Sequence, residues 1–190
     1  MKKFFLVLLT GLLLVGCNSN EPADDPTLLD ENFDICSVMD DAEFKAYCLK
    51  KFDTDGDGKL SFIEGISITE IDVSGDFEKN IIGTIKSLKG IEYFSALTHL
   101  DCSQNQLSSL DISKNTALIK LLCYSNQLTE LDVSNNTELT ILNCDPMTDN
   151  LGQNVLQTLY MKTGQTINKL SKPSETNIVY ISKKIFFYNL

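Results

Sequence analysis

The sequence contains no arginine and a single histidine, His99. Its 16 basic residues are therefore all lysines, which lack the planar guanidinium group that binds phosphate or carboxylate through two parallel hydrogen bonds. One histidine is too few for a histidine-rich zinc site and leaves little material for a Ser-His-Asp triad. These shortages weigh against most enzyme classes.

Positive charge of any kind is scarce. The chain of 190 residues has 26 acidic residues against 16 basic ones, and its net charge of -10 argues against nucleic acid or another polyanion as a partner. With 43% hydrophobic and 22% charged residues, the composition is that of a globular protein. The length suits one domain with at most a small appendage.

The apolar run at residues 4–15 is too short to span a bilayer as a stable helix. It follows Lys2 and Lys3, which is the pattern of a secretory signal peptide. The motif Leu14-Val15-Gly16-Cys17 then resembles the lipobox of bacterial lipoproteins. This resemblance implies that Cys17 is acylated and becomes the mature N-terminus, and several acyl chains would give lasting membrane anchoring. An N-terminal membrane helix is the alternative.

From Asp53 the chain reads DTDGDGKLSFIE, in which the first, third and fifth residues are aspartates. This segment resembles an EF-hand calcium loop at every defining position, and Gly58 stands where the loop turns sharply. The resemblance implies that calcium is bound by the following residues: Asp53, Asp55, Asp57 and Glu64 through carboxylates, Lys59 through its carbonyl, and Ser61 through its hydroxyl or a water. The helical spacing of apolar residues over 44–52 predicts the entering helix.

EF-hands usually occur in pairs, whereas the sequence shows one loop. We therefore expect a structural clamp rather than a calcium switch, with an affinity near the millimolar range of extracellular modules. The alternative is an acidic turn that binds no calcium, although three close carboxylates would repel one another without a cation.

The middle of the chain is repetitive. Residues 97–117 align with residues 118–138 at a period of 21, and the register continues to residue 144. Three columns recur: Leu97, Leu118 and Leu139; Leu100, Leu121 and Leu142; and Cys102, Cys123 and Cys144. This pattern resembles the leucine-rich repeat family, and residues 85–97 resemble the lead-in of internalin-type repeat proteins. The resemblance implies a solenoid with a parallel β ladder, and residues 68–73 and 156–161 fit the same strand pattern.

Equivalent residues of neighbouring coils should stack into apolar columns, because no coil can bury its inward face alone. The three ladder cysteines should stay reduced and buried, because in-register side chains point in parallel and keep their Cβ atoms about 4.8 Å apart, too far for a disulfide. A linear stack of thiols also cannot converge on a metal ion. Asn105 and Asn126 should bond backbone groups after their strands. Cys36 and Cys48 remain, and in an oxidising compartment they either form a disulfide or stay as two buried thiols.

We expect five segments: a signal peptide with lipobox at residues 1–17, a tether at 18–34, an EF-hand-like cap at 35–67, the repeat solenoid at 68–163 and a C-terminal β cap at 164–190. The tether is acidic and contains Pro22 and Pro26. The final IFFYNL is expected to pack in the core or on a sheet edge, with a partner or membrane contact as the alternative.

Solenoids of this type usually bind partners on the strand side. The outward positions there form the candidate partner-binding set: His99, Asp101, Lys120, Leu122, Tyr124, Ile141 and Asn143. Ser103 is also expected to point outward. The apolar members among polar neighbours have the composition of an interface centre, although scattered apolar residues are ordinary on a surface.

Taken together, the sequence predicts a lipid-anchored protein of the cell envelope, at the outer membrane or cell surface. Its repeat face would recognise a protein or glycan, calcium would stiffen its N-terminal cap, and the chain is expected to be monomeric and not an enzyme. Two alternatives stay open: a structural accessory of the envelope without its own ligand and, remotely, a hydrolase that uses carboxylates.

Overall fold

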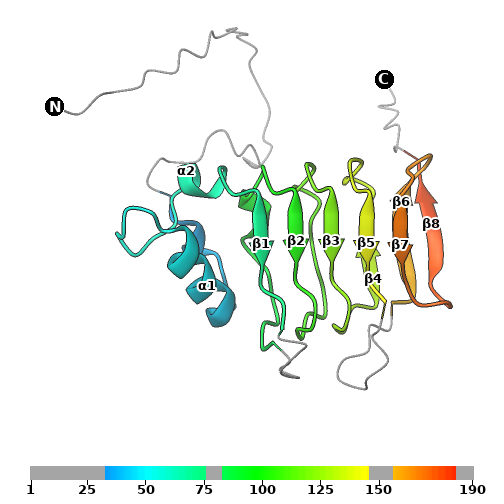
Figure 1. Ribbon diagram of the computed structural model, residues 1–190, viewed down its shortest axis with the longest axis horizontal. Coiled ribbons are helices and arrows are strands. Elements are labelled where there is room, and N and C mark those ends of the chain that lie inside the picture. The colour runs from blue at the N-terminus through cyan, green and yellow to red at the C-terminus, as the bar shows by residue number, and fades with distance from the viewer. Residues whose placement is uncertain (1–32, 76–82, 146–155, 183–190) are drawn as a thin grey trace, which may run out of the picture.

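A computed structural model describes residues 33–75, 83–145 and 156–182 (Figure 1). Cys17 and the predicted signal peptide lie outside these residues, as does the aromatic end from Ile185 to Leu190. Within the described part of the chain, no helix has the length and apolar character needed to cross a membrane.

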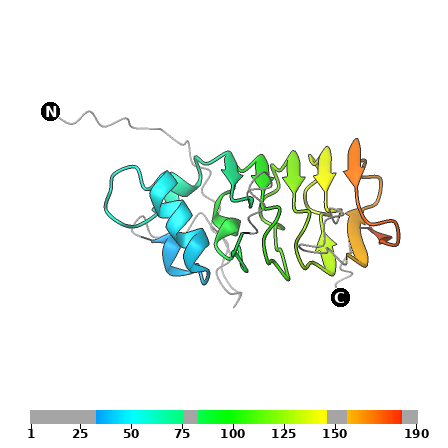
Figure 2. The same ribbon diagram turned by 60° about the horizontal axis from the view of Figure 1, so that its bottom comes forward.

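The described residues form a solenoid of parallel strands with a helical module at its N-terminal end (Figures 1 and 2). The module contains the 3-10 helix η2 (Ile35–Ser37), helix α1 (Ala42–Phe52) and the one-turn helix α2 (Phe62–Gly65). A further 3-10 helix, η3 (Ile91–Tyr93), lies in the first coil. The sequence therefore predicted the entering helix of the module, whereas the exit helix has only four residues.

Two parallel sheets line opposite sides of the solenoid. The first sheet has the order β1-β2-β3-β5-β7, with these bounds: β1 Glu70–Asp72, β2 His99–Asp101, β3 Lys120–Leu122, β5 Ile141–Asn143 and β7 Lys169–Ser171. The second has the order β4-β6-β8, with these bounds: β4 Glu130–Asp132, β6 Thr158–Lys162 and β8 Asn177–Ile181.

The leucine spacing sets the register of the first sheet. Leu100 pairs with Leu121, and Leu121 pairs with Leu142. All three side chains are at most 1% exposed. The repeated leucine thus becomes a continuous buried column, because each side chain covers its equivalent in the next coil. This confirms the predicted leucine-rich repeat solenoid.

Asparagine side chains tie neighbouring coils together inside the core. Asn126 Nδ2 donates to the carbonyl oxygens of Cys102 and Cys123, at 3.0 and 3.1 Å, and its Oδ1 accepts from Leu107 N–H. Asn105 occupies the same place one coil earlier and donates to Val73 O at 2.8 Å. These contacts confirm the predicted structural duty of both residues.

A second asparagine column, which the sequence analysis missed, runs along the other side of the core. Asn136 Nδ2 donates to Ile112 O and Asn115 O, and Asn115 Nδ2 donates to Ile91 O and Phe94 O. Gln165 continues the column by donating to Asn136 O at 2.9 Å. The recurring SKNTA and SNNTE segments carried this signal at the same period of 21 residues.

Residues 156–161 require a correction. They were expected to continue the strand pattern of the first sheet, but β6 pairs with β4 in the second sheet. The next strand of the first sheet is β7, whose Leu170 pairs with Leu142. The reason is that the Leu-x-x-Leu spacing occurs in both halves of a repeat, so residues 156–161 match residues 128–133 as well as they match residues 97–102. Both sheets therefore continue past residue 163, through β7 and β8.

The helical module covers the free edge and the core of the first coil. Asp72 N–H at the edge of β1 donates to the Tyr47 hydroxyl of α1 at 3.2 Å. The rings of Phe52 and Phe94 lie 6.4 Å apart, and Phe94 is fully buried. The module thus closes the N-terminal end of the solenoid, where an open edge would otherwise expose unpaired backbone groups.

Candidate calcium loop and recognition face

The acidic loop starts at the end of α1. That helix begins after Asp41, whose Oδ1 accepts from the N–H groups of Glu43 and Phe44. This is the usual N-cap arrangement, and it fixes the direction in which α1 delivers the chain into the loop. The C-cap residue of α1 is Asp53, the first predicted ligand.

The structure brings the three loop aspartates together. The carboxylate oxygens of Asp53, Asp55 and Asp57 lie within 4.8 Å of one another. Gly58 adopts a left-handed conformation with φ of 82° and donates its N–H to Asp53 Oδ2 at 3.0 Å. The glycine thus allows the chain to fold back over Asp53, which is what the loop spacing predicted.

Glu64 has a different position from the one expected of a ligand. Its Oε1 accepts from the N–H and hydroxyl of Thr54, and its Oε2 accepts from those of Ser61. Burial tends to raise the pKa of Glu64, but these hydrogen bonds outweigh it and lower the pKa to about 2. The carboxylate of Glu64 therefore stays ionised. It joins Thr54 to Ser61 across the loop and lies outside the aspartate cluster.

Lys59 and Ser61 serve the loop through backbone and cap contacts. Lys59 N–H donates to Asp57 Oδ1 at 2.8 Å, and Ser61 is the N-cap of α2, where it forms a capping box with Glu64. The donor set around the cluster consists of oxygen atoms, which is the chemistry that a hard cation such as calcium requires. The residues present therefore fit calcium.

A neighbouring segment of the same module bonds the acidic loop in the place where the second loop of an EF-hand pair would. Ile35 N–H donates to Leu60 O at 2.8 Å, and Leu60 N–H donates to Asp34 Oδ1 at 3.0 Å. Leu60 itself is fully buried. The segment at Asp34 and Ile35 thus supplies the backbone partner of the loop from within the same module.

The predicted partner-binding residues share one face of the first sheet. We call this the first-sheet face, and its outward residues on the strands are these: Glu70, Asp72, His99, Asp101, Lys120, Leu122, Ile141, Asn143, Lys169 and Ser171. Strand pairing aligns His99, Lys120 and Ile141 in one row and Asp101, Leu122 and Asn143 in the next. All six are half-buried, and Tyr124 just beyond β3 is half-buried as well. The expectation that Ser103 points outward is wrong, since this residue is fully buried.

Asp101 is the most perturbed carboxylate on this face. Burial raises its pKa above the usual value, and the neighbouring Asp72 adds to the effect, while hydrogen bonds from Ser103 act in the opposite direction. His99 shares a 2.9 Å hydrogen bond with the Thr98 hydroxyl through Nδ1. An open pocket on the face is lined by the following residues: Glu70, Ile71, Asp72, His99, Leu100, Asp101 and Lys120.

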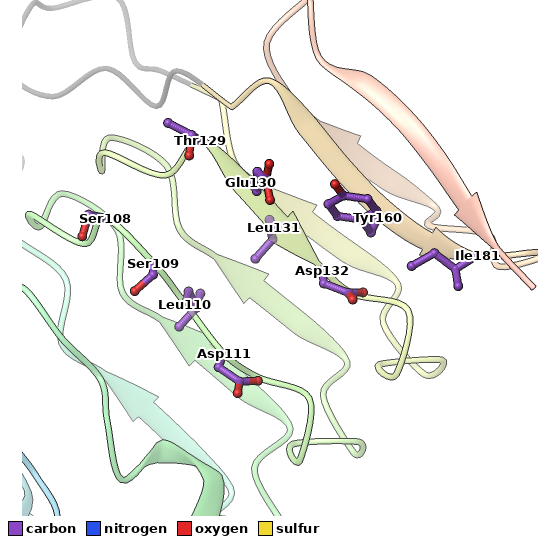
Figure 3. Close-up of a pocket in the computed structure, with 10 residues that line it drawn as sticks. All are labelled: Ser108, Ser109, Leu110, Asp111, Thr129, Glu130, Leu131, Asp132, Tyr160 and Ile181. Atoms are coloured by element: carbon purple, nitrogen blue, oxygen red, sulfur yellow. The ribbon is translucent and has the colours of Figure 1, made fainter. Parts of the chain in front are cut away.

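A second open pocket, not predicted from the sequence, lies on the second-sheet side (Figure 3). Asp111, Asp132 and Tyr160 are among its lining residues, and Ile181, the last residue of β8, lines its far end. Asp132 pairs with Tyr160 in the strand register. The repeated LDIS and LDVS segments at residues 110–113 and 131–134 were visible in the sequence but were assigned only to the apolar columns.

None of the five described cysteines is in a disulfide. The ladder cysteines Cys102, Cys123 and Cys144 are each fully buried, and burial raises the pKa of all three thiols, that of Cys144 to about 12. Cys36 and Cys48 are buried thiols, and burial raises the pKa of Cys36 to about 11. Among the described residues, the aspartates of the loop are the only group of at least three potential metal ligands close enough to share an ion.

Comparisons with known proteins agree with this geometry. No protein-family model matches the sequence, and no curated protein matches it. Among solved structures, the functional domain of InlJ from Listeria monocytogenes, described as including a cysteine ladder, is similar with 26% identity and a TM-score of 0.55. The match covers 78% of this chain and 34% of the InlJ chain.

An internalin, InlF, from Listeria monocytogenes is similar with 24% identity and a TM-score of 0.46 over 77% of this chain and 34% of its own. The chain therefore spans about a third of the length of the structures it matches. The fold is that of an internalin-like leucine-rich repeat solenoid.

Proposed function

We propose that this protein is a recognition protein of the bacterial cell envelope that binds a protein partner through the first-sheet face. The observation that carries the proposal is the position of Leu122, Tyr124 and Ile141. Leu122 and Ile141 lie half-buried in the middle strands of the face and Tyr124 lies just beyond β3, with charged residues on the strands to either side. An apolar and aromatic centre with a polar rim is the usual composition of a protein interface.

Binding to solubilised envelope proteins tests this proposal. The full-length protein in detergent should retain specific partners, and Tyr124→Ala or Leu122→Asp should release them. Tyr160→Ala on the second-sheet side is the matched control, because it removes a half-buried tyrosine from the other face. Partners that remain on both first-sheet variants would contradict this face as the binding surface, and the absence of any specific partner would favour an accessory role without a ligand.

The proposal includes one calcium ion in the acidic loop, where it acts as a structural clamp. Three aspartate carboxylates gathered on an exposed loop repel one another, and a divalent cation would remove that repulsion. A chelator should lower the melting temperature, and Asp53→Ala should abolish this response. Asp40→Ala, an exposed aspartate outside the loop, should leave it unchanged. A melting curve that is the same with and without chelator would remove calcium from the proposal.

The proposal also includes lipid anchoring through Cys17 and no catalysis. The lipobox motif supports the anchor, because acylation of its cysteine holds an exported protein at the membrane. Cys17→Ser should move the protein from the membrane fraction to the soluble fraction and abolish incorporation of labelled palmitate. Incorporation that persists in Cys17→Ser would place the lipid elsewhere.

A further inference from the structure

Charge changes sign along the first-sheet face. Strand by strand from the N-terminal end, the outward pairs are Glu70 and Asp72 on β1, His99 and Asp101 on β2, Lys120 and Leu122 on β3, Ile141 and Asn143 on β5, and Lys169 and Ser171 on β7. The face is therefore acidic over β1 and β2, has Lys120 beside its apolar centre, and carries the exposed Lys169 on β7, where Ser171 donates to Asp145 Oδ2.

The chain itself offsets the charge of the acidic end only in part, through Lys120 on the neighbouring strand. No ion pair forms between residues of the described ranges on this face, and Glu70 has no hydrogen bond to a described residue. Asp72 and Asp101 are register partners, and the Oδ1 atom of each accepts a hydrogen bond from the N–H of the serine two residues later. The second oxygen of each carboxylate is left for another molecule. Burial is the main cause of the elevated pKa of Asp101, Asp72 adds to it, and Ser103 and Lys120 act in the opposite direction.

The basic end is equally available. Lys169 is exposed, and its register partner is Ile141, which carries no charge. Lys172 differs, because its ammonium group already donates to the carbonyl oxygens of Pro173 and Thr176. Lys169 is therefore the cation that β7 offers to a partner on this face.

We propose that the partner contributes an extended segment that crosses the strands with basic side chains over β1 and β2, an apolar side chain over Leu122 and Ile141, and an acidic side chain over Lys169. This inference rests on the proposed function and names the chemistry of its partner. Strands in a sheet are about 4.8 Å apart, so the four intervals from β1 to β7 span about 19 Å. An extended chain covers that distance with about six residues.

A polypeptide suits this face better than a glycan. The face is complementary to a ligand that carries both signs of charge with an apolar group between them, within the length of about six extended residues. A protein segment supplies this order freely, whereas a glycan polymer repeats the same unit along its length. Complementary charge at both ends would also fix the orientation of the segment.

The two sheets contain a matched pair of strands for the test. β1 reads Glu70-Ile71-Asp72 and β4 reads Glu130-Leu131-Asp132, and both have exposed acids on either side of a buried apolar residue. The double variant Glu70→Lys with Asp72→Lys reverses the charge of the first-sheet face. Glu130→Lys with Asp132→Lys makes the same change on the second sheet, so both variants have the same net charge.

The experiment is a selection of displayed random nonapeptides on the immobilised full-length protein in detergent. Enriched peptides should carry a basic group and an acidic group on opposite sides of an apolar residue. They should bind the reversed β4 variant as well as the original protein and the reversed β1 variant at least about tenfold more weakly. Their affinity should also fall with rising salt.

Two other results are informative. Peptides that lose binding with Leu122→Asp but bind the reversed β1 variant unchanged would overturn the charge order and leave the proposed recognition face intact. If peptides are enriched but none of them depends on Leu122, both proposals fail. A glycan array is screened in parallel, and glycan binding that Leu122→Asp abolishes, without peptide enrichment, would overturn the protein partner and leave the first-sheet face as the binding surface.

Discussion

Single polar residues inside the solenoid bond the buried backbone groups that lie between the stacked apolar columns. Asn126 is fully buried and bonds backbone groups of its own coil and the preceding one. A buried backbone carbonyl or N–H without a partner costs about 1–3 kcal/mol. The asparagines are therefore as much part of the repeat as its leucines.

Asn126→Ala should lower the free energy of unfolding by about 3 kcal/mol, because it removes the side-chain bonds to Cys123 O and Leu107 N–H and one of the two asparagine bonds to Cys102 O. Denaturant unfolding followed by circular dichroism measures this loss. Asn135→Ala is the control, since Asn135 is exposed, and it should change stability by less than about 0.5 kcal/mol. Equal effects of both substitutions would contradict the structural role of the column.

Two aspartates of similar local sequence should respond to pH with opposite signs. Burial raises the pKa of Asp101, so its ionised form costs stability once the pH exceeds the pKa of the unfolded chain. Hydrogen bonds from Ser113 lower the pKa of Asp111, so its contribution is present above the unfolded pKa and is lost as the pH falls through the folded pKa.

Asp101→Asn should therefore raise the melting temperature at pH 7, and by a modest amount because Asp101 is only partly shielded from solvent. Its advantage should vanish at about pH 3, where Asp101 is protonated. Asp111→Asn should lower the melting temperature at pH 7 instead. Thermal unfolding across this pH range checks both, and a stabilising Asp111→Asn would show that the assignment is wrong.

Among the elements, the cysteine ladder is a packing device. Its thiols stack in the core beside the leucine columns, and Cys102 and Cys144 donate weakly to Leu122 O and Ser171 O. Burial raises the pKa of each thiol, and alkylation requires the thiolate.

Iodoacetamide at pH 8 should accordingly leave Cys102, Cys123 and Cys144 unmodified in the folded protein and label all three after denaturation. Mass spectrometry of tryptic peptides provides the readout. Labelling of the folded protein at a rate near that of a free peptide would mean that the ladder is accessible to solvent. Cys36 and Cys48 are buried thiols too, and reducing and non-reducing digests of protein exported by cells would show whether they pair there.

The elements also show how far sequence could lead. The period of 21 residues predicted β2, β3 and β5 with their register, because identical inward residues leave one way to stack. It did not assign β6 to the correct sheet, because both halves of the repeat use the same leucine spacing. The loop spacing predicted the gathering of Asp53, Asp55 and Asp57. It did not predict the bond of Leu60 to Ile35, because that contact joins residues 25 positions apart without a recognisable pattern.

At the scale of the whole molecule, each coil contacts only its neighbours, so a perturbation at one end should weaken with distance. The acidic loop is connected to the solenoid through the helical module to which it belongs. Its contacts with the first coil include the bond from Asp72 to Tyr47 and the packing of Phe52 on Phe94. Nothing of this kind connects the module to β4, β6 or β8 among the described residues.

Chelation of the proposed calcium ion should therefore accelerate amide hydrogen exchange in α1, α2 and β1, with a smaller increase in β2 and none in β6 and β8. The reason is that loss of this ion would destabilise the module, and the solenoid would transmit the loss one interface at a time. Exchange measured by mass spectrometry with and without chelator gives the profile, and Asp53→Ala should reproduce it without chelator. A uniform increase from β1 to β8 would show instead that module and solenoid unfold as one cooperative unit, in which case the calcium loop stabilises the recognition face directly.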